Sequence, residues 1–184
     1  LSSFNDVAGT LITAEDNIMM EAPLISGIAF TRDEAKLTLR GVKDQPGIAS
    51  SILAPISEAN IEVDMIVQNI GADFSTDFTF TVARADFELA QSILTAVSER
   101  IGAQEVLGDE RIAKLSIVGV GMRSHAGVAA QMFDILAKES INIQMISTSE
   151  IKISVVIDEK YLELAVRALH AGFGLEADLG AESA

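Results

Sequence analysis

Hydrophobic and polar residues follow two different periods along this chain, and these periods predict strands and helices in a regular order. The run Phe-Thr-Phe-Thr-Val at 78–82 alternates with the two-residue period of a strand that buries one face. Apolar residues at 48, 52, 53 and 56 recur at the spacing of one face of a helix. The same reading along the first half predicts strand 37–42, helix 47–58, strand 61–69, strand 77–83, helix 86–100 and strand 103–108.

The second half of the chain repeats most of this order. It is predicted to contain strand 114–120, helix 127–139, strand 142–148, strand 151–157 and helix 159–171. The order βαββαβ is typical of the ferredoxin-like α+β fold, in which helices cover one face of an antiparallel sheet. The chain is therefore expected to form two ferredoxin-like domains.

The second domain lacks a fourth strand of its own, because the residues after His170 are acidic and interrupted by glycine. A short apolar strand at 25–30, followed by a polar turn at 32–34, is left over before the first domain. We expect this leading strand to complete the second sheet. The first domain, residues 36–109, would then be inserted within the second, residues 113–175.

The two halves are also similar residue by residue. Leu37-Thr-Leu-Arg-Gly-Val42 corresponds to Leu115-Ser-Ile-Val-Gly-Val120, and Gly47-Ile-Ala49 corresponds to Gly127-Val-Ala129. Further along, Ile61-Glu-Val-Asp-Met65 corresponds to Ile141-Asn-Ile-Gln-Met145, and Phe87-Glu-Leu-Ala90 corresponds to Leu162-Glu-Leu-Ala165. A repeat of about eighty residues is too long for a solenoid unit. Each copy is therefore a small domain, which indicates a binding module used twice.

Composition excludes several classes of protein. The net charge of −14 disfavours nucleic acid as a partner, and an aromatic content of 5% without Trp disfavours base stacking. No apolar run approaches the ~20 residues of a membrane span. The chain has no cysteine, which fits a reducing cytoplasm and excludes thiol chemistry and disulfides.

Catalytic motifs are also absent from the sequence. The two histidines, His125 and His170, have no metal-ligand spacing, and no phosphate-binding glycine motif opens a helix after a strand. We therefore expect no catalytic residue, no metal site and no cofactor in this chain.

Ligand binding is better supported, by a glycine that precedes or opens the first helix of each half. The loops Lys43-Asp-Gln-Pro-Gly47 and Met122-Arg-Ser-His-Ala-Gly127 each lead into a helix, whose free N–H groups and dipole favour an anion such as an α-carboxylate. Polar residues nearby are candidates to hold the ammonium group of an amino acid, and we expect Asp64 to face the first loop. The candidates are Asp44, Asp64 and Gln68 in the first half and Asn142, Gln144, Ser147 and Ser149 in the second.

At these residues the sequence resembles the tandem ACT domains of aspartate kinases. The segments that carry the resemblance are Val63-Asp-Met-Ile-Val-Gln-Asn69, Thr76-Asp-Phe-Thr-Phe80, Lys114-Leu-Ser-Ile-Val-Gly-Val-Gly-Met-Arg-Ser-His125 and Ile146-Ser-Thr-Ser-Glu150. Residues 1–20 resemble the end of the preceding kinase domain. The resemblance implies a regulatory part, similar to a separate β subunit, that forms a homodimer and inhibits a kinase domain or catalytic subunit when end-product amino acids bind.

The parent enzyme implied by the resemblance phosphorylates aspartate with ATP and Mg in lysine, threonine and methionine biosynthesis. The resemblance also implies two effector sites. The threonine-type site comprises Asp44, Gly47, Ile48, Ala49, Glu62, Val63, Asp64 and Gln68, completed by Asn142 and Ile143 from a second module, expected in the partner chain. The lysine-type site comprises Ser124, His125, Ala126, Gly127, Val128, Ala129, Ser149 and Glu150.

Three positions depart from the pattern of lysine-inhibited relatives. Gln144 stands where some have an acidic residue, and Gly71 and Ala129 stand where others have hydroxyl residues. The alternative is an ACT-type amino-acid sensor, or a dimerisation module, attached to a different enzyme. The segment 1–20 discriminates between these readings, because only a preceding kinase domain accounts for it.

Overall fold

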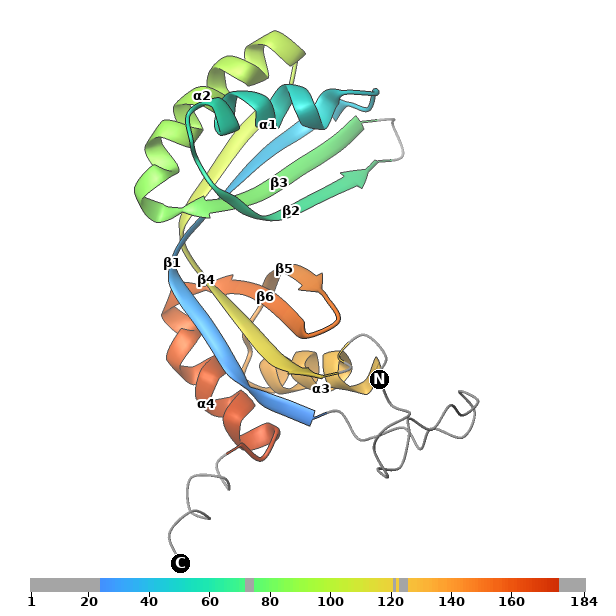
Figure 1. Cartoon of the computed structure of the whole chain (residues 1–184), viewed down its shortest axis with the longest axis vertical. Helices are drawn as coiled ribbons and strands as arrows, with labels where there is room; N and C mark the ends of the chain where they lie inside the picture. Colours follow the sequence, from blue (N-terminus) through green and yellow to red (C-terminus); the bar gives the residue numbers. More distant parts are fainter. Residues whose placement is uncertain (1–23, 72–74, 121, 123–125, 176–184) are drawn as a thin grey trace, which may run out of the picture.

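The computed structural model describes residues 24–71, 75–120, 122 and 126–175. The segment 1–20, interpreted as the end of a kinase domain, lies outside the described residues. The elements follow the chain in the order β1 (Leu24–Lys43), α1 (Ile48–Glu58), β2 (Val63–Ile70), β3 (Ser75–Ala83), α2 (Phe87–Ile101), β4 (Glu105–Val120), α3 (Ala126–Lys138), β5 (Ile143–Thr148), β6 (Lys152–Asp158) and α4 (Leu162–Gly172) (Figure 1). Short 3-10 turns, η3 (Arg84–Asp86) and η4 (Glu159–Tyr161), precede α2 and α4.

The strands form one antiparallel sheet in the order β2-β3-β1-β4-β6-β5, and its two central strands run through both halves of the molecule (Figure 1). In the first half, Leu37 of β1 pairs with Gly108 of β4, and β1 also pairs with β3. In the second half, Phe30 of β1 pairs with Leu115 of β4, which also pairs with β6. The leading strand therefore completes the second sheet, and the ferredoxin-like fold with the first module inserted in the second is confirmed.

The polar turn expected at 32–34 is wrong, because β1 continues through these residues. The strand passes them with register shifts between Thr31 and Lys36, and it remains paired with β4 on both sides. The polar side chains find partners at the junction: Arg32 contacts Glu163 at 3.1 Å, and Glu34 contacts Lys114. Likewise, strands 103–108 and 114–120, expected to be separate, are parts of β4. A pattern read over short windows cannot distinguish a polar bulge from a turn.

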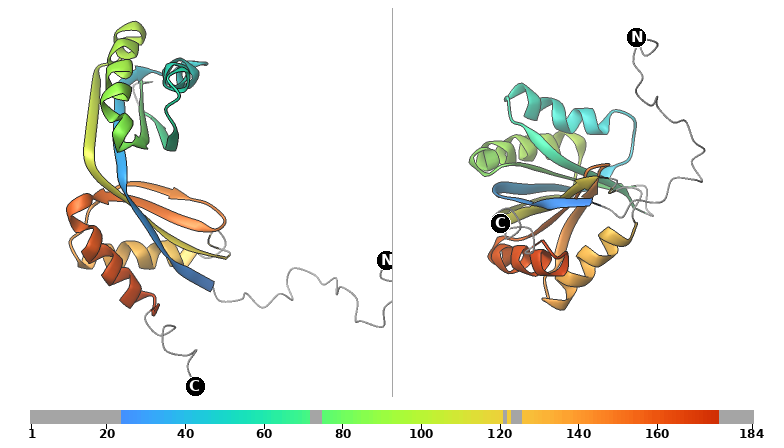
Figure 2. Two further views of the ribbon diagram at one scale, coloured as in Figure 1. Left: turned by 60° about the vertical axis from the view of Figure 1, so that its left-hand side comes forward. Right: turned by 60° about the horizontal axis from the view of Figure 1, so that its bottom comes forward.

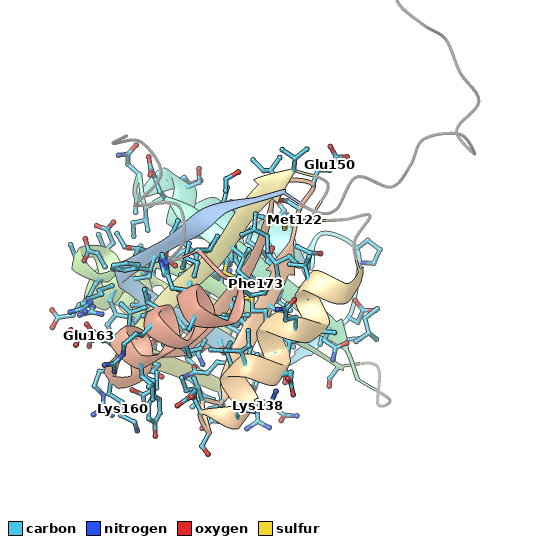
Figure 3. All side chains as sticks on the ribbon, turned by 90° about the horizontal axis from the view of Figure 1, so that it is seen from below. Met122, Lys138, Glu150, Lys160, Glu163 and Phe173 are labelled. Atoms are coloured by element: carbon cyan, nitrogen blue, oxygen red, sulfur yellow. The ribbon has the colours of Figure 1, made fainter. Side chains whose placement is uncertain are left out.

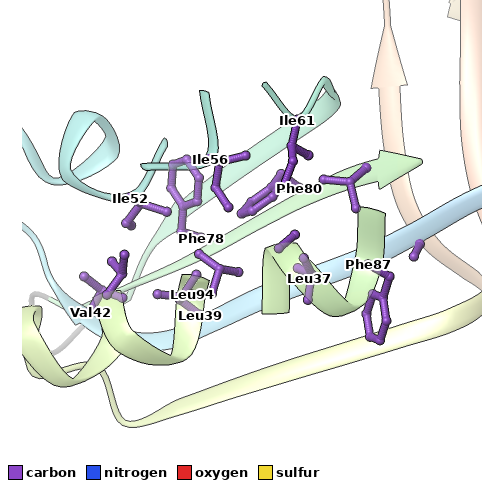
Figure 4. Close-up of a cluster of buried hydrophobic side chains, with 14 of the residues drawn as sticks. Leu37, Leu39, Val42, Ile52, Ile56, Ile61, Phe78, Phe80, Phe87 and Leu94 are labelled. Atoms are coloured by element: carbon purple, nitrogen blue, oxygen red, sulfur yellow. The ribbon is translucent and has the colours of Figure 1, made fainter. Parts of the chain in front are cut away.

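Each half has its own hydrophobic core between its helices and its part of the sheet. In the first half, Ile52 and Ile56 of α1 pack with Leu94 of α2 against Phe78 and Phe80 of β3 (Figure 4). The second core is formed by the equivalent faces of α3, α4, β4 and β6. Figure 2 shows α1 and α2 on one side of the strands and α3 and α4 on the opposite side. The sheet is therefore shared, whereas the helical layers are not.

Equivalent residues of the repeat meet where the two halves join. Met65 of β2 and Met145 of β5 occupy the same position in the two copies, and they share a small buried cluster with Ile112 and Val156. The hydroxyls of Thr38 and Thr79 bond to each other at 2.9 Å in the first half, and those of Ser116 and Ser154 do so at 2.7 Å in the second. The repeat seen in the sequence is thus an approximate two-fold symmetry of the structure.

Candidate functional site

The loop between β1 and α1 has the backbone geometry of an anion-binding helix start. Gly47 adopts the left-handed conformation, with φ 88° and ψ −3°, immediately before α1. The amide of Ser51 donates to the Gly47 carbonyl at 2.9 Å, and the amide of Ile48 donates to the Gln45 carbonyl at 3.2 Å. The next two amides, those of Ala49 and Ser50, have no acceptor within the helix. The first turn of α1 carries no acidic residue, and no side chain caps it. The positive end of the helix dipole is therefore available to bind an external anion.

A cavity of about 370 Å³ opens beside this loop. It brings together five of the residues predicted for the threonine-type site, Asp44, Gly47, Ile48, Ala49 and Gln68, together with Gln45 and Pro46. The side chain of Ile48 points into the core, so it can offer only its backbone. The cavity thus combines amides for a carboxylate with the carboxylate of Asp44 and the amide of Gln68, which is the polarity needed for an amino acid.

Replacing Gly47 by alanine is expected to destabilise the fold by about 1–2 kcal/mol, because an L side chain is strained in the left-handed region. No heavy atom lies within 4 Å of the position that a Cβ would take, so the cost comes from the backbone alone. Urea denaturation measures it. The matched control is Gly127→Ala, at the equivalent glycine of α3, where the φ is not left-handed and alanine should be neutral or stabilising. Equal losses in both variants would contradict this account of the loop.

Asp64 does not face this loop, contrary to the expectation from the sequence. It lies four residues before Gln68 on β2, which separates the two Cα atoms by roughly 13 Å along the strand. Asp64, Glu62 and Val63 line a different cavity, of about 500 Å³, together with Glu34 and Lys114. The carboxylate of Asp64 accepts a hydrogen bond from the Lys114 ammonium. The sequence pattern could not show this, because Lys114 belongs to the other half of the repeat.

Lys114 is held between two carboxylates, those of Glu34 and Asp64. Burial by itself would lower the pKa of Lys114, but the hydrogen bonds and charges of Asp64 and Glu34 outweigh it and raise the pKa above its ordinary value. Glu34 is buried, and its second oxygen has no hydrogen-bond partner among the described residues. The pair therefore depends on Lys114 to neutralise a carboxylate that has little access to water.

Asn142 and Ile143 also lie away from the first loop within this chain. Asn142 is exposed just before β5, and Ile143 lines a third cavity, of about 340 Å³, between the two halves. That cavity includes Lys36 and Thr79 from the first half and Gln144 from the second. One chain alone therefore does not assemble the complete threonine-type set.

The lysine-type loop is described only in part. Ser124 and His125 lie outside the described residues, whereas Ala126, Gly127, Val128 and Ala129 form the first turn of α3. Figure 3 shows Met122 and Glu150 at one end of the second module, with Lys138, the last residue of α3, towards the other. The amide of Met122 donates to the Glu150 carbonyl at 3.0 Å, and the amide of Ser149 donates to the Lys152 carbonyl at 2.8 Å.

Ser149 and Glu150 therefore lie in the β5–β6 turn, where Ser149 bonds to Lys152 within the turn and the Glu150 carbonyl accepts from Met122, which follows β4. Val128 is buried in the second core, so its side chain cannot contact a ligand in the loop. Among the described members of the set, Gly127 and Ala129 at the start of α3 and Ser149 and Glu150 near the end of β5 remain candidates for a second loop site.

Sequence reasoning missed the lysines of the junction. Lys36 and Lys114 occupy the same position in the two copies, and both place their ammonium groups between the halves. A signal was present, because a lysine recurs between two apolar residues of a strand in both copies: Ala35 and Leu37 flank Lys36, and Ala113 and Leu115 flank Lys114. Lys114 bonds to Glu34 and Asp64, and Lys36 bonds to Gln144. In each case the partner lies in a different strand from the lysine, so spacing along the chain does not reveal the contact.

Other kinds of site are not found in the part of the chain that the structure describes. Within residues 24–71, 75–120, 122 and 126–175, no group of three or more His, Cys, Asp or Glu side chains is arranged to hold a metal ion. None of the helices in these ranges has the length and apolar character needed to cross a membrane. Among the described residues, a function can be argued from the cavity at the start of α1 and from the junction.

Comparison with known proteins agrees with the fold and with its division into two similar halves. The family model for the ACT domain matches residues 38–97 and 115–173, so the chain belongs to the ACT-domain family. A crystal structure of the regulatory subunit of aspartate kinase from Thermus thermophilus, in its ligand-free form, is 41% identical, covers 82% of this chain and 99% of that chain, and has a TM-score of 0.77. Within the ACT family, the chain therefore belongs with the regulatory portions of aspartate kinases.

Two further comparisons give the same result. A crystal structure of aspartokinase alpha and beta subunits is 55% identical over 82% of this chain and 99% of that chain, with a TM-score of 0.77. The aspartate kinase of Pseudomonas putida is 68% identical over 96% of this chain. The chain spans 43% of the length of that enzyme, so it corresponds to a portion of such relatives.

Proposed function

We propose that this chain binds threonine in the first loop and lysine in the second, and that binding inhibits an aspartate kinase to which the chain belongs. The parent enzyme would phosphorylate aspartate with ATP and Mg in the cytoplasm. A kinase domain or catalytic subunit, which this portion does not include, would carry out that reaction. The observation that carries the proposal is the cavity at the start of α1, which is lined both by the free amides of the helix start and by Asp44.

An amino acid needs both of these groups at once. Its carboxylate would accept hydrogen bonds from the amides at the helix start, where the dipole favours negative charge. Its ammonium would pair with Asp44, and Gln68 would bond to a polar side chain such as the threonine hydroxyl. Asp64 is not part of this arrangement, since it is engaged by Lys114.

A second copy of the chain would complete the site. Asn142 and Ile143 do not line the cavity beside the Gly47 loop in the same chain, whereas a partner's second module can supply them. The strands β2 and β5 form the two edges of the described sheet, and β2 carries the exposed apolar residues Ile66 and Ile70. Apolar sheet edges of this kind favour association between chains. We therefore propose a homodimer in which the effector bridges two modules and stabilises the inhibited arrangement through its differential affinity.

Calorimetric titration of the chain with the protein amino acids, singly and in pairs, tests this function. We expect threonine to bind, lysine to bind at a separate site, and sedimentation to show a dimer. A chain that remains monomeric at micromolar concentration with threonine present would count against the assignment. Binding of a different amino acid, with no response to threonine, would support the alternative of an ACT-type sensor that serves another enzyme.

A further inference from the structure

The approximate two-fold symmetry of the junction places Lys36 and Lys114 in equivalent positions, yet their surroundings differ in charge. Around Lys114 there are two acids, Glu34 and Asp64. The residues that the repeat places in the corresponding positions around Lys36 are Ile112, for Glu34, and Gln144, for Asp64. Both acids of one site are thus replaced by neutral residues in the other.

Lys36 is half-buried without an ion-pair partner among the described residues. Its ammonium donates one hydrogen bond, to the side-chain oxygen of Gln144. Asp109 lies opposite it on β4 and attracts it, but this carboxylate accepts from the Arg111 amide at 2.9 Å and makes no ion pair with Lys36. Burial lowers the pKa of Lys36, and the charge of Asp109 opposes that shift only in part. An ammonium has three donors, and among the described residues only one of them is used, so two remain for another acceptor.

A cavity of about 340 Å³ adjoins this ammonium. Its polar wall consists of Lys36, Thr79 and Gln144, and its apolar wall consists of Val67, Ile143, Met145 and Ile146. The Thr79 hydroxyl is paired with that of Thr38, so it can donate to a ligand in the arrangement in which Thr38 is the donor of that pair. The volume is within the range of small-molecule sites, which begins at roughly 300 Å³.

We infer that this cavity is a third ligand site, distinct from both loops, and that it binds a small aliphatic carboxylate. The second half of the molecule shows what an equivalent lysine takes, because Lys114 is bonded to the carboxylate of Asp64. In the first half Gln144 stands in the place of Asp64 and accepts one hydrogen bond from Lys36, so the ligand's carboxylate would accept from the other hydrogens of that ammonium, and its hydrocarbon chain would lie against Val67 and Ile146. A free amino acid fits less well, because its ammonium would approach Lys36 with no acid in ion-pair contact to balance the two charges.

The test is a titration of the methyl-labelled chain with sodium butyrate, followed by NMR. The methyl signals of Val67, Ile143, Met145 and Ile146 should shift and saturate, whereas those of Ile52 and Leu136 in the two cores should not. Butyramide, which has the same shape without the charge, should bind at least about ten-fold more weakly, as should butyrate to Lys36→Met, because a charge-assisted hydrogen bond is lost. Lys152→Met, which removes an exposed charge elsewhere, is the matched control and should bind butyrate as the unaltered chain does.

Gln144→Glu gives a second test that does not depend on removing the lysine. It restores to the first half the acid that Asp64 provides in the second, so the new carboxylate should occupy Lys36 and abolish butyrate binding. Unmoved methyl signals in the unaltered chain, equal affinity for butyramide, or full binding by a folded Lys36→Met or Gln144→Glu variant would each overturn the inference.

Discussion

Lys114→Met is expected to destabilise the chain by about 3–5 kcal/mol, the usual cost of removing one partner of a buried ion pair. The loss arises at Glu34, whose side chain is 10% exposed and would keep a charge without a partner. Asp64 contributes less, because its side chain is 48% exposed and water screens it. Urea denaturation measures the loss, with the slope of the transition as a check on two-state unfolding.

The double variant Lys114→Met with Glu34→Gln separates the missing charge from the missing packing. Removing both charges should recover most of the stability, so a double variant as unstable as Lys114→Met would contradict the ion-pair explanation. The pH dependence gives a further check. The pKa of Lys114 in the folded chain is raised above 10.5, so its contribution is present below pH 10.5 and is lost as the pH rises through the folded pKa. The unaltered chain should therefore lose more stability above pH 10.5 than Lys114→Met does.

Asp44→Ala is expected to weaken threonine binding by about 10-fold to 150-fold, which corresponds to a charge-assisted hydrogen bond of roughly 1.5–3 kcal/mol. Asp44 is the acidic residue that lines the cavity at the start of α1, and it is exposed, so the fold should tolerate its loss. Calorimetry measures the affinity, and thermal unfolding without threonine verifies that the variant is folded.

Asp64→Ala is the informative control for this result. Because Asp64 is bonded to Lys114 and lies away from the loop, its loss should lower stability modestly and leave threonine affinity close to that of the unaltered chain. If Asp64→Ala abolished threonine binding while Asp44→Ala did not, the ammonium site would have to lie at the junction.

The fold could be predicted closely from the sequence, because it depends on local periodicity and on a repeat. The helix bounds follow from the apolar spacing: helix 47–58 was expected and α1 is Ile48–Glu58. The fusion of the central strands could not be predicted in this way. Arg32 and Glu34 look like a turn until their partners Glu163 and Lys114 are known, and both partners lie far away in the sequence.

The candidate site was predictable to the same extent. Gly47 and Asp44 were found because a loop and a helix start are consecutive in the chain, and the structure places them in one cavity with Gln68. The predicted orientation of Asp64 is wrong. The pairing of β2 with β3 contains a bulge between Val63 and Ile66, which changes the face of the strand on which Asp64 lies. The junction lysines were missed because their partners belong to the opposite copy.

The two central strands have a consequence for how the molecule comes apart. Neither half is an independent domain, because each takes one strand of its sheet from a segment shared with the other half. Residues 24–31 of β1 complete the sheet of the second half, and residues 105–109 of β4 complete the sheet of the first. Trimming away one half would therefore strip an outer strand from the other and expose an apolar core edge. The two halves should melt together as one cooperative unit, and a ligand that binds either loop should protect the whole chain from unfolding.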